Sequence, residues 1–150
     1  MKIKEYLIDN YLLNPEDKIN LFFFIGPDSG LTDQRVKTLS KTLRIDNNNP
    51  FNVSKIDQNE LEKNPTKLLD ESLTYSLDTE KRFVFLKIYS ENIPTSVVRS
   101  IKDLIGHLPL KDTKIIISAR NLSLTLPLVK HINENVFCNT FVSYQKSAKS

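Results

Sequence analysis

The sequence has few of the residues from which metal and redox sites are built. It contains one cysteine, Cys138, and two histidines, His107 and His131, with no His-x₃-His or Cys-x₂-Cys spacing. A lone cysteine excludes an internal disulfide, and without paired ligands a zinc site is not expected. We therefore predict no cofactor and no metal, and interpret Cys138 as a small buried hydrophobe and both histidines as surface residues.

Long apolar runs are also absent. No stretch approaches the ~18 apolar residues of a membrane span, and the opening residues, 1–5, lack the apolar core of a secretory signal. We expect no membrane partner and a cytoplasmic protein. With 150 residues, the chain is predicted to form a single domain over residues 1–150. Its tail, residues 145–150, is expected to be disordered because it has no apolar anchor.

Charge is distributed unevenly along the chain. Residues 1–80 carry 10 basic and 14 acidic side chains, whereas residues 81–150 carry 11 and 4, and the net charge is +3. The basic second half fits a surface for nucleic acid or an acidic partner. Folding interleaves the two halves, however, so a mixed and solvated surface is the interpretation that we favour.

One stretch, residues 18–31, organises the rest of the chain. Five apolar residues, Leu21 to Ile25, end abruptly at Gly26-Pro27-Asp28-Ser29-Gly30, as a strand buried on both faces does when it enters a loop. The apolar spacing then becomes helical over residues 31–45, with Asp28 or Ser29 as the expected N-cap. Strand, loop and helix form the first half of a βαβ unit.

Similar patterns predict the other elements. Helices are expected at residues 2–13, 65–76, 94–107 and 126–133, and strands at residues 51–56, 81–89, 113–118 and 135–139, with a polar, turn-rich segment at 57–64. The alternation predicts an α/β three-layer sandwich with a mainly parallel sheet of about five strands and a topology like that of P-loop NTPases.

The loop after the first strand has the position of a nucleotide site without its residues. A P-loop needs G-x-x-x-x-G-K-[ST], but Gly26 and Gly30 are one residue too close and Leu31 stands where the lysine belongs. Asp28 adds a negative charge where a phosphate would lie. The strand at residues 83–86 is followed by Lys87, which has the wrong sign for holding Mg²⁺. We interpret Gly26, Asp28 and Gly30 as a degenerate P-loop and expect no enzymatic activity.

Leu77 is the residue of greatest interest outside the core. It lies in the polar run from Thr74 to Lys81, between a predicted helix and a predicted strand. An exposed apolar residue at a helix tip can enter a partner's pocket. Alternatively, Leu77 folds back on Leu73 as a helix-ending contact, which the residues alone slightly favour.

Several segments, taken in order and spacing, resemble the N-terminal RecA-like domain of the delta subunit of the bacterial DNA polymerase III clamp loader. The resemblance covers roughly residues 19–140. It rests on the first strand with Gly26-x-Asp28, on Asn49-Pro50-Phe51-Asn52-Val53 before Ile56-Asp57, on Ser76-Leu77, and on Lys114-Ile115-Ile116-Ile117 before Ala119-Arg120-Asn121-Leu122-Ser123.

This resemblance implies a protein that binds no ATP and grips the sliding clamp, the beta subunit, by a helix-tip Ser-Leu-Phe element that enters a clamp pocket. Ser76 and Leu77 match this element, but Asp78 replaces the phenylalanine. Loss of a buried aromatic costs about 2 kcal/mol or more of binding free energy. Tyr75 precedes the element but points about 100° away around the helix.

The resemblance also implies domains that have no counterpart in this chain. Delta subunits continue into a lid domain and a collar domain that joins the other clamp-loader subunits, so the chain is an excised domain, a truncated product or a stand-alone relative. Three alternatives to clamp docking remain open: a nucleic-acid-binding module that uses the basic second half, with weak DNA contact, a relative that has lost clamp binding and, ranked last, NTP hydrolysis.

Overall fold

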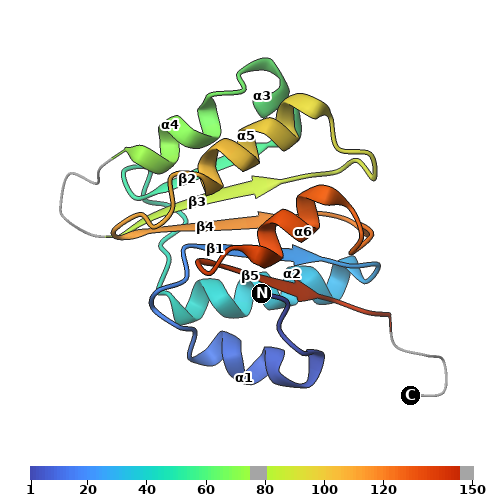
Figure 1. Cartoon of the computed structure of the whole chain (residues 1–150). Helices are drawn as coiled ribbons and strands as arrows, with labels where there is room; N and C mark the ends of the chain where they lie inside the picture. Colours follow the sequence, from blue (N-terminus) through green and yellow to red (C-terminus); the bar gives the residue numbers. More distant parts are fainter. Residues whose placement is uncertain (75–80, 146–150) are drawn as a thin grey trace.

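A five-stranded parallel sheet forms the centre of the molecule. The computed structural model describes residues 1–74 and 81–145 (Figure 1). The strands lie in the order β2-β3-β4-β1-β5, and every pair of neighbours is parallel. This confirms the predicted α/β fold. The strands are β1 (Leu21–Ile25), β2 (Val53–Asp57), β3 (Arg82–Lys87), β4 (Thr113–Ser118) and β5 (Cys138–Val142).

Helices cover both faces of the sheet. Figure 1 shows α3 to α6 on one face and α1 and α2 on the other. Each face has its own apolar core, as expected for a three-layer arrangement. The helical elements are the 3₁₀ turn η1 (Glu5–Leu7) and the helices α1 (Ile8–Leu13), α2 (Ser29–Thr42), α3 (Gln58–Lys63), α4 (Lys67–Leu73), α5 (Thr95–Ile105) and α6 (Pro127–Glu134).

Strand β1 is buried on both faces, as its sequence predicted. Because side chains alternate along a strand, Leu21, Phe23 and Ile25 enter the core beneath α3 to α6, whereas Phe22 and Phe24 enter the core beneath α1 and α2. The ring of Phe24 stacks on that of Phe141 in β5, with 4.8 Å between ring centroids. Strand β1 therefore joins the two cores.

The second core stops short of one edge of the sheet. It contains side chains of β1, β4 and β5, but from β3 it includes only the partly buried Phe85 at its margin. On the same face, Lys55 of β2 and Lys87 of β3 are exposed. Helices α1 and α2 thus leave the β2–β3 part of this face uncovered.

The segment after β2 was predicted as a polar loop, and this prediction is wrong. It forms α3, whose first turn is capped by Asp57: the carboxylate accepts a hydrogen bond from the Glu60 N–H at 2.8 Å. Leu61 is fully buried. One apolar residue in six leaves too little periodicity for the sequence to reveal the helix.

The last strand lies about three residues later than predicted. Strand β5 runs from Cys138 and includes the polar residues Asn139 and Thr140, both buried. The Asn139 amide donates to the Tyr11 hydroxyl at 2.7 Å, and the Thr140 hydroxyl donates to Asn133. Because side-chain partners satisfy these buried polar groups, the apolar pattern alone misplaced the strand.

Candidate functional site

The degenerate P-loop connects β1 to α2 at the carboxyl end of the sheet. Asp28 is the N-cap of α2, as predicted: its carboxylate accepts from the Leu31 N–H at 2.9 Å, and its carbonyl accepts from the Thr32 N–H at 3.0 Å. Gly30 lies in the first turn of this helix. A carboxylate therefore occupies the position where a nucleotide phosphate would meet the helix N-terminus.

Neighbouring backbone carbonyls take up the donors of this loop. The Gly26 N–H donates to the Arg120 carbonyl at 3.3 Å, and the Asp28 N–H donates to the Ser143 carbonyl at 3.2 Å. In turn, the Ser143 N–H donates to the Ile25 carbonyl at 2.8 Å. A phosphate-binding loop needs free N–H groups, and here the segments that follow β4 and β5 engage two of them.

A cavity of about 490 Å³ lies beside this loop. Lys87 and Arg120 line it together with Asp33 and Glu91, so its charge is mixed. Among the described residues no group of three or more His, Cys, Asp or Glu side chains is placed to hold a metal ion. The cavity marks the position of a nucleotide site in this fold class, but Leu31 stands where the lysine of such a site belongs.

The predicted clamp-binding element follows α4. Tyr75, Ser76, Leu77 and Asp78 lie outside the described residues, and so does the tail 146–150. Leu73, the partner of Leu77 in the alternative interpretation, is 42% exposed at the end of α4.

Arg82, at the start of β3, ties together the structure on either side of that segment. Its guanidinium donates to the Glu71 and Phe51 carbonyls, each at 2.9 Å, to the Ser54 hydroxyl at 2.6 Å and to the Glu71 carboxylate. The residue is 5% exposed. Sequence reasoning missed this arginine; the only available signal was a cation at the first position of an otherwise apolar strand.

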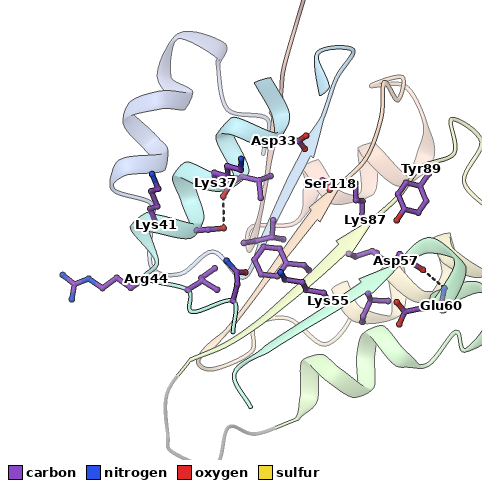
Figure 2. Close-up of a pocket in the computed structure, with 18 residues that line it drawn as sticks. Asp33, Lys37, Lys41, Arg44, Lys55, Asp57, Glu60, Lys87, Tyr89 and Ser118 are labelled. Atoms are coloured by element: carbon purple, nitrogen blue, oxygen red, sulfur yellow. Dashed lines mark hydrogen bonds between the residues drawn. The ribbon is translucent and has the colours of Figure 1, made fainter. Parts of the chain in front are cut away.

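A groove of about 750 Å³ lies on the face of the sheet that α1 and α2 leave uncovered. Figure 2 shows α2 along one side of it and the β2 and β3 strands along the other, with Lys37 and Lys41 on α2 and Lys55 near the centre. No sequence pattern predicted this groove, because its walls come from α2, β2, β3 and β4, which are distant in the chain.

The cysteine and the histidines are where the sequence predicted them. Cys138 is fully buried, and burial raises the pKa of its thiol to about 12. His107 is exposed, with its Nδ1 atom 2.8 Å from the Asp103 carbonyl, and His131 is exposed on α6. None of the three contributes to either cavity.

The strand order and the closed loop define a class of protein: an α/β domain built on a nucleotide-binding type of scaffold whose phosphate loop is degenerate. Among the described residues, no helix is long and apolar enough to span a membrane. Residues 8–141 match the family "DNA polymerase III, delta subunit". Because the match covers most of the chain, the protein belongs to this family of clamp-loader subunits, which act in DNA replication.

Solved structures agree on the fold. The Bacillus subtilis DNA clamp loader delta protein superposes with a TM-score of 0.71 at 18% identity, over 97% of this chain and 44% of that chain. A DNA polymerase III gamma subunit-related protein from Thermotoga maritima gives a TM-score of 0.56 at 10% identity, over 97% and 47%. The chain thus spans less than half the length of these relatives. No curated protein matches it.

Proposed function

We propose that this chain is a non-catalytic domain that docks on the sliding clamp, the beta subunit, through residues 75–78. Leu77 is the apolar anchor, Ser76 precedes it as in the family element, and Tyr75 and Asp78 flank them. Membership of the delta-subunit family supports this proposal. The domain acts in the cytoplasm, with the other clamp-loader subunits as further partners.

The Glu71–Arg82 ion pair is the observation that carries the proposal. Glu71 lies on α4, before residues 75–78, and Arg82 begins β3, after them. Their contact anchors both ends of a short connection to the body of the domain. Anchored ends reduce the conformational entropy that residues 75–78 would lose on docking. The buried Arg82 would therefore favour binding by this segment.

The loop after β1 supports the proposal that the domain is non-catalytic. Asp28 occupies the N-terminus of α2, and carbonyls of Arg120 and Ser143 engage two loop N–H groups. Binding a nucleoside triphosphate there requires breaking these hydrogen bonds and placing a phosphate beside the Asp28 carboxylate. The domain contributes contacts to its assembly and leaves the hydrolysis of NTP to other subunits.

Capture on the immobilised cognate sliding clamp tests the proposal. We expect Leu77→Ala to abolish capture and to leave the melting temperature nearly unchanged. Leu13→Ala is the matched control, because Leu13 is 66% exposed on α1, far along the chain from the proposed contact. Asp78→Phe is expected to strengthen capture by restoring an aromatic to the pocket, and ATP with Mg²⁺ is expected to change nothing.

Three outcomes would count against clamp docking. If Leu77→Ala unfolds the domain, Leu77 is a core residue. If Leu77→Ala folds and is captured as well as wild type, the contact lies elsewhere. If wild type is not captured at all, the chain is a relative that has lost clamp binding.

Nucleic-acid binding by the basic second half is the second candidate. Two of its basic residues are turned inward: Arg82 is buried, and the Lys114 ammonium donates to the Asp17 and Ile19 carbonyls, each at 2.6 Å. The remaining cations support at most weak DNA contact. Such contact would weaken steeply as salt rises, whereas docking through Leu77 would be much less sensitive.

A further inference from the structure

The floor of the groove is built by the register of three parallel strands. Lys55, Phe85 and Ile116 are aligned across β2, β3 and β4, and Asp57, Lys87 and Ser118 form the next aligned row on the same face. Val36 and Ile45 add apolar surface from α2 and the turn that follows it. The apolar part of the groove is formed by Phe85, Ile116, Val36 and Ile45, whereas the row of Asp57, Lys87 and Ser118 is polar.

Several cations surround this floor. Five basic residues line the groove and are exposed, and within residues 1–74 and 81–145 none of them forms an ion pair. They are Lys37, Lys41, Arg44, Lys55 and Lys87.

Two of the three carboxylates in the groove are already engaged. Glu60 pairs with Lys67 at 2.9 Å, and Asp57 caps α3. Asp33, at the end near the β1–α2 loop, and Asp57 form no ion pair in the described part of the chain, so five unpaired cations face two unpaired carboxylates. The groove therefore presents an excess of unpaired positive charge on either side of an apolar strip.

We infer that this groove binds an acidic amphipathic helix, a segment of a partner protein with an apolar stripe flanked by carboxylates. The apolar stripe covers Phe85 and its neighbours, and the carboxylates meet cations on both walls. Lys37, Lys41 and Arg44 are four and three residues apart on α2 and its end. Lys37 and Lys41 are about 6 Å apart along α2 at 1.5 Å per residue, about one turn of a bound helix, and Arg44 follows the end of α2.

The arrangement of charge favours a helix over single-stranded nucleic acid. A single strand carries its phosphates along one edge and stacks its bases on a series of aromatic faces. Here the cations occupy both walls, and the only aromatic residues that line the groove within the described chain are Phe85 and Tyr89. An apolar stripe between two acidic edges matches both features.

Fluorescence anisotropy with a synthetic probe tests this inference on the 150-residue chain. The probe is a labelled peptide of about 15 residues, with leucines at three- and four-residue spacing and glutamates on both sides of the leucine stripe. Its scrambled sequence and a labelled oligothymidylate are the comparison ligands. We expect the amphipathic peptide alone to bind well.

Charge-reversal variants then locate the site. Lys37→Glu combined with Lys41→Glu is expected to weaken peptide binding by about tenfold or more, because it places like charges against the glutamates. Lys63→Glu combined with Lys102→Glu makes the same change in charge on α3 and α5, across the sheet, and is expected to leave binding within about twofold. Both pairs of lysines are exposed. Lys37→Gln combined with Lys41→Gln is expected to give an intermediate loss of peptide affinity. This neutral variant replaces the charge reversal in the test if the reversal lowers the melting temperature.

Each alternative result overturns the inference. If the groove and control variants bind the peptide equally well, the peptide site lies outside the groove. Oligothymidylate that binds more tightly than the peptide, and is lost in the groove variants, makes the groove a nucleic-acid site. If the peptide does not bind at concentrations up to about 1 mM, the groove does not bind an acidic amphipathic helix. Clamp capture by the groove variants is expected to match wild type, because α4 lies on the opposite face of the sheet.

Discussion

Ser143 packs directly over Gly26. A Cβ atom added to Gly26 would lie 2.4 Å from the Ser143 carbonyl oxygen and 2.7 Å from its backbone nitrogen, and Gly26 has a φ of +135°. Only glycine allows both the close approach and this backbone conformation. The glycine that the sequence places in a phosphate loop is thus used to bring the chain after β5 against the end of β1.

Gly26→Ala should therefore destabilise the domain substantially. We expect a loss of about 2 kcal/mol or more in the free energy of unfolding, because backbone atoms must move to admit the methyl group. Denaturant titration followed by circular dichroism measures this loss. Gly30→Ala is the control: its Cβ would meet the Asp28 carboxylate at an ordinary 3.6 Å, and alanine favours the helix, so stability should hold or rise. Equal stability of the two variants would refute the packing role of Gly26.

Arg82 should be essential for stability at the α4–β3 junction. Arg82→Met removes a buried cation, leaves the Phe51 carbonyl without its donor and leaves the Glu71 carboxylate with only the Ser54 hydroxyl, which we expect to cost about 3 kcal/mol of unfolding free energy. Arg82→Lys should also be destabilising, since one ammonium cannot reach all these acceptors.

Arg99→Met is the control for this change, because Arg99 is exposed on α5. It should alter stability by no more than about 0.5 kcal/mol. If Arg82→Met proves as stable as Arg99→Met, the Arg82 contacts do not hold the ends of residues 75–80 together.

Cys138 should make stability fall at alkaline pH. Its pKa is raised to about 12 from a usual value of 9.0 by burial, so between these pH values the unfolded chain loses a proton that the folded chain keeps. Stability from this group is complete below pH 9 and decreases as pH rises toward 12. Denaturant titrations of wild type and Cys138→Ala across this window measure the effect: the variant should show a shallower decline, and parallel declines would contradict the assignment.

The same thiol should resist alkylation in the folded protein. The thiolate is the reactive species, and burial disfavours it. Iodoacetamide at pH 8 is expected to label Cys138 only as fast as the domain opens, whereas denatured protein labels at once. Rapid labelling of the native protein would show that the Cys138 side chain is accessible.

The main elements were predictable because each has a local cause. The continuous apolar run of β1 signals burial on both faces, and Asp28 at the start of α2 supplies a cap that can be recognised in any sequence. Strand β4 was predicted with the bounds it has, since its branched apolar residues favour extended backbone.

Other features depend on partners that are far away in the chain. Strand β5 includes Asn139 because Tyr11 accepts its hydrogen bond, and α3 is held by the buried Leu61 and Gln58, whose amide bonds the segment after β3. Arg82 reads as an ordinary surface cation until Glu71 and Phe51 are brought to it. These contacts join residues 11 to 128 positions apart, and no local pattern of residue types specifies them.

The sequence by itself determined the class of fold and showed how the first loop departs from the P-loop pattern, because apolar periodicity and the identity of loop residues are local properties of the chain. It also carried the family resemblance, through the order of its motifs. Only the tertiary structure decided where Arg82 anchors the α4–β3 junction and where unpaired lysines surround an apolar groove. Both arise when parallel strands and crossing helices bring distant side chains into register, which is a property of the assembled sheet.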